Sequence, residues 1–105
     1  MPEEVGVILE NLESINKSEF GDLKLYSGKF FLDNSREIFI TTAWSGWGKV
    51  SAARATTRLL SSKYNNVPVD KAIFTGVAGA VDAKLKKWDV IIADSVIQHD
   101  MDARP

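Results

Sequence analysis

Two glycine turns hold the residues of this chain that are best suited to chemistry. Residues 45–49 read SGWGK and residues 75–80 read TGVAGA, and the second turn follows an apolar run at residues 72–74 that is typical of a buried strand. A strand that ends in small residues leaves backbone N–H groups open to a ligand. Open α/β sheets bind their ligands at the carboxyl ends of their strands. The turns therefore indicate a small-molecule site.

The first turn does not make a nucleotide-binding phosphate loop. Such a loop needs a glycine five residues before its Gly-Lys pair and a Ser or Thr directly after it. Ala43 and Val50 occupy those positions, which excludes an NTPase of this type. Two interpretations of the turn stay open: anion binding by backbone N–H groups at the start of a helix, or a tight turn that brings the helix close to a sheet.

The chain also carries two groups of polar side chains that could act on a ligand. Glu3 and Glu4 lie in the first turn of an expected helix, where they either complement the helix dipole or supply one general base. His99, Asp100 and Asp102 have the types and spacing of metal ligands. Because no second ligand cluster accompanies them, a polar loop is the favoured interpretation, and we predict neither a metal nor a cofactor.

Composition excludes several classes of partner. The 105 residues carry a net charge of −1, which gives no electrostatic case for binding nucleic acid or an anionic membrane. No apolar run approaches the roughly 20 residues of a membrane helix. The N-terminus is acidic where a signal peptide would be basic, and there are no cysteines. We expect a cytoplasmic protein.

Periodicity predicts an α/β fold. The pattern indicates helices at residues 2–15 and 49–62, strands between residues 20 and 43 around a turn at 33–35, and further strands at 72–77 and 89–97. The last two strands are rich in Val and Ile, as strands buried on both faces are. This favours a mixed or parallel sheet that is covered by helices.

Five segments of the chain resemble one enzyme superfamily. They are residues 1–5, 45–53, 75–80, 85–92 and 99–102. In order and spacing they resemble the purine nucleoside phosphorylase/nucleosidase superfamily, and most closely its 5′-methylthioadenosine/S-adenosylhomocysteine nucleosidases.

The resemblance implies a partial three-layer α/β/α fold with a mixed sheet. Residues 1–105 would be an incomplete domain that lacks the family's first strand and its C-terminal half. The family's ribose-binding glutamate and base-protonating aspartate match no residue of this chain. The resemblance therefore implies that the 105-residue chain alone is inactive.

The resemblance also assigns site residues. Glu4 matches the glutamate that activates the attacking water, and a carboxylate there can also stabilise a cationic ribosyl species. The residues that match the ribosyl and 5′-substituent pocket are Met1, Trp47, Val77, Ala78 and Gly79. The implied substrate is a purine nucleoside, and the implied assembly is a homodimer whose subunits meet near residues 99 and 100.

Two positions favour hydrolysis over phosphorolysis. Many phosphorylases of the superfamily hold phosphate with an Arg and a Ser or Thr where this chain has Phe74 and Val77. Their loss removes charge-assisted contacts worth roughly 1.5–3 kcal/mol each. Val77 also departs from the usual nucleosidase Gly-Ser-Ala-Gly-Gly, and Trp88 replaces a usual glycine. The alternatives are a phosphorylase with an atypical phosphate site and a non-catalytic fragment that self-associates.

Overall fold

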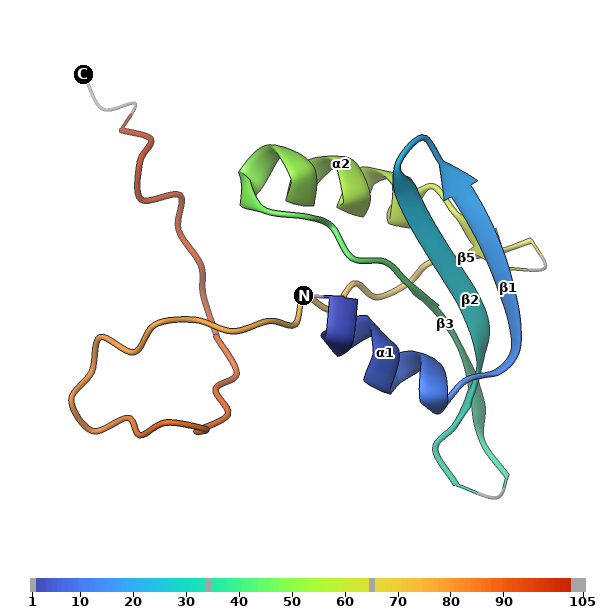
Figure 1. Cartoon of the computed structure of the whole chain (residues 1–105), viewed down its shortest axis with the longest axis horizontal. Helices are drawn as coiled ribbons and strands as arrows, with labels where there is room; N and C mark the ends of the chain where they lie inside the picture. Colours follow the sequence, from blue (N-terminus) through green and yellow to red (C-terminus); the bar gives the residue numbers. More distant parts are fainter. Residues whose placement is uncertain (1, 34, 65, 103–105) are drawn as a thin grey trace.

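The computed structural model describes residues 2–33, 35–64 and 66–102, with residues 2–4 and 64 described by their backbone alone (Figure 1). The described residues form seven elements in the order α1 (Pro2–Glu10), β1 (Glu13–Phe20), β2 (Leu23–Phe31), β3 (Glu37–Thr42), α2 (Gly48–Leu60), β4 (Lys63–Tyr64) and β5 (Val67–Pro68). No helix in these ranges is long and apolar enough to cross a membrane.

The main sheet is an antiparallel meander in the order β1-β2-β3. A short turn joins β1 to β2, and Gly21 in that turn adopts a φ of +61°, which favours glycine. On the other side of β2, the Ser27 and Thr41 hydroxyls lie 2.9 Å apart across the strand pair. Both outer strands lie at edges of the described sheet, so β2 is its central strand.

A small core holds α2 against the central strand. Leu23 and Leu25 alternate with exposed Lys24 along β2, which places both leucines on one face. Ala55 of α2 packs against them, and the small side chain lets the helix approach closely. At the same end, the Arg54 guanidinium donates two hydrogen bonds, of 2.6 and 3.1 Å, to the two carboxylate oxygens of Asp22. The bonds from Arg54 lower the pKa of Asp22.

Gly28 sets the path of the chain that leads from α1 into β1. A Cβ atom at this position would lie 2.9 Å from the Glu13 carbonyl oxygen and 3.1 Å from the Leu12 Cβ. The backbone at residues 12 and 13 therefore crosses directly over the middle of β2, and Leu12 is buried there. Only a glycine gives room for this crossing.

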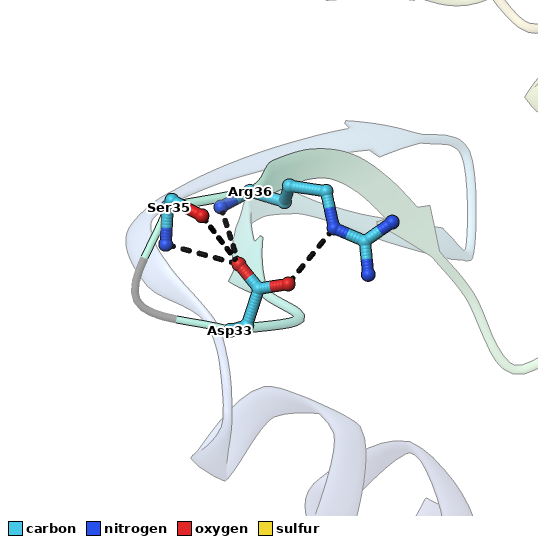
Figure 2. Close-up of polar contacts among 3 residues, drawn as sticks. All are labelled: Asp33, Ser35 and Arg36. Atoms are coloured by element: carbon cyan, nitrogen blue, oxygen red, sulfur yellow. Dashed lines mark hydrogen bonds and ion pairs between the residues drawn. The ribbon is translucent and has the colours of Figure 1, made fainter.

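Asp33 organises the hairpin between β2 and β3. Its Oδ1 accepts hydrogen bonds from the Ser35 N–H, the Ser35 hydroxyl and the Arg36 N–H, and its Oδ2 accepts one from Arg36 Nε at 2.8 Å (Figure 2). This is the side-chain turn expected of an aspartate between two strands. The Arg36 bond and then the Ser35 bonds lower the pKa of Asp33 to about 2. The return strand is thus confirmed, and Asp33 and Ser35 are joined as the predicted turn requires, while residue 34 between them lies outside the described residues.

The first helix is shorter than the sequence predicts. We expected it at residues 2–15, but it ends at Glu10, and residues 13–20 form β1 instead. Asn11 closes the helix by donating from Nδ2 to the Val7 carbonyl at 2.8 Å. The residues after it then pair with β2, so strand pairing prevails over the helical spacing of Ile15 with the preceding apolar residues. The prediction of a helix at 49–62 is confirmed by α2.

The prediction of strands at residues 72–77 and 89–97 is wrong for this structure. Residues 69–102 contain no helix or strand, and they lie to one side of the sheet as the orange and red part of the chain (Figure 1). Phe74 is 83% exposed and Ile92 is 94% exposed. A buried strand exists only when neighbouring strands pair with its backbone, and no described strand lies beside these residues. Helices combined with a sheet agree with the α/β class, while a mixed sheet stays a prediction, because all described strand pairs are antiparallel.

Candidate functional site

The expected water-activating residue lies in the first turn of α1. Pro2 begins this helix, and its fixed φ suits the first helical position. Glu4 therefore has a helical backbone, and its side chain lies outside the described part of the structure. Met1, an expected pocket residue, lies outside the described residues altogether. The roles of both residues stay predictions.

Trp47 occupies a sharply defined position at the start of α2. It is the N-cap residue, with φ −89° and ψ 141°, and it forms no side-chain capping bond. Gly46 before it has φ +84° and Gly48 after it has φ +86°, values that glycine adopts without strain. The indole is 75% exposed. The two glycines thus turn the backbone on both sides of Trp47 and present its ring at the surface.

Residues 75–80, where the sequence predicts the second glycine turn, form no turn, helix or strand in the structure. They take part in no hydrogen bond among the described parts of the chain, so their backbone N–H groups are free to solvent. A Cβ atom on Gly79 would meet nothing within 4 Å, and one on Gly76 would meet only the Phe74 ring, at 3.8 Å. Val77 is 79% exposed, and Ala78 beside it is exposed too. In this arrangement neither Gly76 nor Gly79 occupies a position that requires glycine.

An ion pair joins the first glycine turn, at residues 45–49, to the polar residues at positions 99–102. Lys49 Nζ donates to Asp100 Oδ2, which links the start of α2 to a residue 51 positions later. Both side chains are substantially exposed, so the pair is worth at most about 1 kcal/mol of stability, and its importance lies in placement. Across the described residues, no three His, Cys, Asp or Glu side chains lie close enough to hold a metal ion.

The turn at residues 82–89 shows why glycine is usual at the position of Trp88, and nothing in the structure explains the tryptophan itself. Asp89 donates its N–H to the Lys86 carbonyl at 3.1 Å, and its Oδ2 accepts the Lys86 N–H at 2.9 Å. Between them, Trp88 has φ +79°. A bulky residue is strained in this left-handed region, whereas glycine is not. The turn geometry is therefore the reason why a glycine suits this position.

The structure brings together some of the expected site residues and leaves others apart. Lys49 and Asp100 connect residues 45–49 with residues 99–102. Within the described ranges, no hydrogen bond or ion pair connects residues 75–80 with either group. Sequence reasoning did not single out the Lys49–Asp100 pair, because nothing in the sequence relates two exposed charges so far apart.

The comparisons with known proteins agree with one another on the family. A family model described as the phosphorylase superfamily matches residues 1–105. A 5′-methylthioadenosine/S-adenosylhomocysteine nucleosidase of Staphylococcus haemolyticus (strain JCSC1435) is 40% identical over 103 residues, which cover 98% of this chain and 41% of that protein. The protein of the same name from Staphylococcus aureus (strain JH9) gives the same identity and coverage. The chain thus spans about two fifths of the length of these relatives. No solved structure matches the chain.

Proposed function

The chain belongs to the phosphorylase superfamily, and from this premise we propose that residues 1–105 are part of a purine nucleosidase. Its substrates would be nucleosides of the 5′-methylthioadenosine and S-adenosylhomocysteine type. Water would replace the purine at C1′ of the ribosyl group, which gives the free base and a ribosyl product. One observation carries the proposal: relatives with this name share 40% identity with 98% of the chain.

In this proposal residues 1–105 form the first part of a three-layer domain with a mixed sheet. Further parts of that domain would cover residues 72–97, which contain no strand in the structure. Their exposure supports this, because side chains such as Phe74 and Ile92 are apolar and nearly uncovered. We further propose that the protein works as a homodimer. We place it in the cytoplasm, since it has no cysteines for disulfide bonds.

The proposed mechanism begins at Glu4. Its carboxylate accepts a proton from the attacking water and faces the positive charge that develops on the ribosyl group as the glycosidic bond breaks. Met1, Trp47 and residues 77–79 line the pocket for the ribosyl group and its 5′ substituent. Open backbone N–H groups at residues 75–80 support a binding role for that turn. The chain needs neither a metal nor a cofactor for these steps.

Water is the proposed nucleophile because the chain lacks side chains that would hold phosphate. Phe74 and Val77, at the positions that bind phosphate in many phosphorylases, carry neither a charge nor a side-chain donor. At these two positions a phosphorylase could offer phosphate only backbone N–H groups. Base release at full rate in phosphate-free buffer is the expected result, and strict phosphate dependence would favour phosphorolysis instead.

The proposal is tested in a chain of the relatives' length that contains residues 1–105. We expect this longer chain to release adenine from methylthioadenosine and the 105-residue chain to release none. Glu4→Gln should lower kcat/KM by roughly 10²–10⁴, the usual contribution of a general base. Glu10→Gln, at the other end of α1, is the matched control and should leave kcat/KM unchanged. A folded longer chain that releases no base from any nucleoside would refute the proposal.

A further inference from the structure

The start of α2 carries a positive charge at the end of the helix where negative charge is favoured. The first turn of α2 contains Lys49 and no acidic residue, and Trp47 at the N-cap supplies no side-chain acceptor. The N-terminus of a helix already bears a partial positive charge from its unpaired N–H groups. The local sequence thus leaves this end of α2 without a compensating anion.

Asp100 brings that anion from a distant part of the chain. Its Oδ2 accepts a hydrogen bond from Lys49 Nζ. Asp100 itself lies within a turn that is closed by a 3.2 Å hydrogen bond from the Met101 N–H to the Gln98 carbonyl. The carboxylate is therefore presented by a bonded turn, and the pair ties this turn to the first turn of α2.

The ion pair lies close enough to Trp47 along the chain to influence the direction of the indole ring. Lys49 is separated from Trp47 only by Gly48, and both Gly48 and Gly46 have positive φ values. A residue between two such glycines has few side-chain contacts to fix its direction, and the indole is mostly exposed. The direction of the ring thus depends on how firmly the backbone is held beyond each glycine. Beyond Gly48 the backbone is held by α2 itself, and the ion pair links this start of the helix to residues 98–101.

We propose that the Lys49–Asp100 ion pair is a positioning contact that fixes Trp47 with respect to residues 98–101. Neither side chain touches the reacting atoms; each acts through the backbone that carries Trp47. The consequence for substrate binding rests on the proposed function, in which Trp47 lines the ribosyl pocket. The contact thereby couples that pocket to the His99-Asp100 segment.

The positioning is tested first in the 105-residue chain, without any assay of activity. The chain has no cysteines, so Met101→Cys offers a single site for a nitroxide label. In this labelled chain we expect paramagnetic broadening of the Trp47 indole N–H signal in NMR spectra. The broadening should weaken in Lys49→Met and in Asp100→Asn, and it should return in the charge-exchanged pair Lys49→Asp with Asp100→Lys. Lys87→Met removes a lysine outside the pair and should change nothing.

Salt gives a second measurement that needs no substitution in the pair. Exposed charges are screened between about 0.05 and 0.5 M salt, so the broadening should decrease over this range in the chain that keeps Lys49 and Asp100. Broadening that is insensitive both to salt and to Lys49→Met would overturn the proposal. The spread of the backbone amide signals in the same spectra shows whether each variant is folded.

The effect on binding is tested by kinetics in the chain of the relatives' length. Lys49→Met and Asp100→Asn should each raise KM for methylthioadenosine about two- to fivefold, the range of an exposed ion pair, with kcat unchanged. The double variant should raise KM no further than either single one, because both remove the same contact. An unchanged KM, or a loss confined to kcat, would overturn the coupling to the pocket.

If the unsubstituted longer chain releases no base, the proposed function fails, and the NMR measurements still decide whether the pair positions Trp47.

Discussion

At the scale of single residues, backbone geometry gives the clearest constraint. Trp88 adopts φ +79° in a turn whose hydrogen bonds connect Asp89 and Lys86. A contact with Lys87, whose Nζ lies 5.1 Å from the centroid of the Trp88 ring, offsets part of this backbone strain. Because both side chains are exposed, this cation–π contact is worth only about 0.5–1 kcal/mol. The position therefore retains a residue that its backbone disfavours.

Replacement of this tryptophan by glycine should stabilise the turn. The left-handed conformation costs a non-glycine residue roughly 1–2 kcal/mol, so Trp88→Gly should raise the population of the closed turn roughly five- to thirtyfold. Hydrogen exchange at the Asp89 amide measures this population, because that N–H closes the turn. Trp88→Ala removes the ring and keeps the backbone cost, so it should give no such protection. Equal protection in both variants would show that the ring, and not φ, matters.

At the scale of elements, the fold depends on how closely residues 12 and 13, between α1 and β1, approach the central strand. Gly28 permits this close approach, because a Cβ atom there would lie 2.9 Å from the Glu13 carbonyl oxygen and 3.1 Å from the Leu12 Cβ, closer than van der Waals contact allows. Gly28→Ala should lower the free energy of unfolding by roughly 1–3 kcal/mol, because backbone atoms must move. Urea denaturation of the 105-residue chain measures this. Gly6→Ala in α1 is the matched control: nothing lies within 4 Å of its Cβ, and a gain of up to about 1 kcal/mol is expected.

The β2–β3 hairpin should be sensitive to acid. The pKa of Asp33 falls from 3.8 to about 2, mainly through its bond to Arg36. A lowered carboxyl pKa stabilises the folded state above the unfolded pKa, and this contribution is lost as pH falls from about 3.8 to about 2. Asp33→Asn should remove the part of the acid sensitivity that arises in this window. Equal pH dependence of unfolding in both chains between those values would contradict this assignment.

Sequence patterns predict those elements whose signals are local. The strands on either side of Asp33 and the helix after Gly48 formed as expected, because each depends on neighbours in the chain. The helix at 2–15 was predicted too long, because Ile15 fits a helical face and a strand equally well. Ile15 lies in a strand because residues 13–20 pair with β2. The strands at 72–77 and 89–97 depend on partner strands, and the apolar pattern says nothing of whether those are present.

The candidate site was predictable only in part, for a related reason. The glycine turns and the first-turn glutamates are visible in the sequence, and the structure places Trp47 between two left-handed glycines. The pairing of Lys49 with Asp100 has no sequence signal, since any exposed lysine and aspartate could pair. The backbone strain at Trp88 could not be predicted from the sequence either, because it follows from the geometry of the turn in which this residue lies.

At the scale of the whole molecule, the exposed apolar segment at residues 72–97 favours self-association of the chain in solution. Side chains such as Phe74 and Ile92 are uncovered over a long stretch, more than monomeric proteins usually show. We expect the 105-residue chain to self-associate with increasing concentration, as measured by sedimentation velocity. Phe74→Ser together with Ile92→Ser should shift the chain towards monomer. Val50→Ser, an exposed position on α2, is the control and should have no effect.

The nucleosidase assignment is tested most directly by the origin of the new oxygen on the ribosyl product. A chain of the relatives' length that contains residues 1–105 is incubated with methylthioadenosine in ¹⁸O-labelled water with inorganic phosphate also present, and the product is analysed by mass spectrometry. The account predicts free adenine and a ribosyl product that carries one ¹⁸O atom at C1′ and no phosphate. A ribosyl 1-phosphate without the label, or no release of adenine by the folded chain, would contradict it.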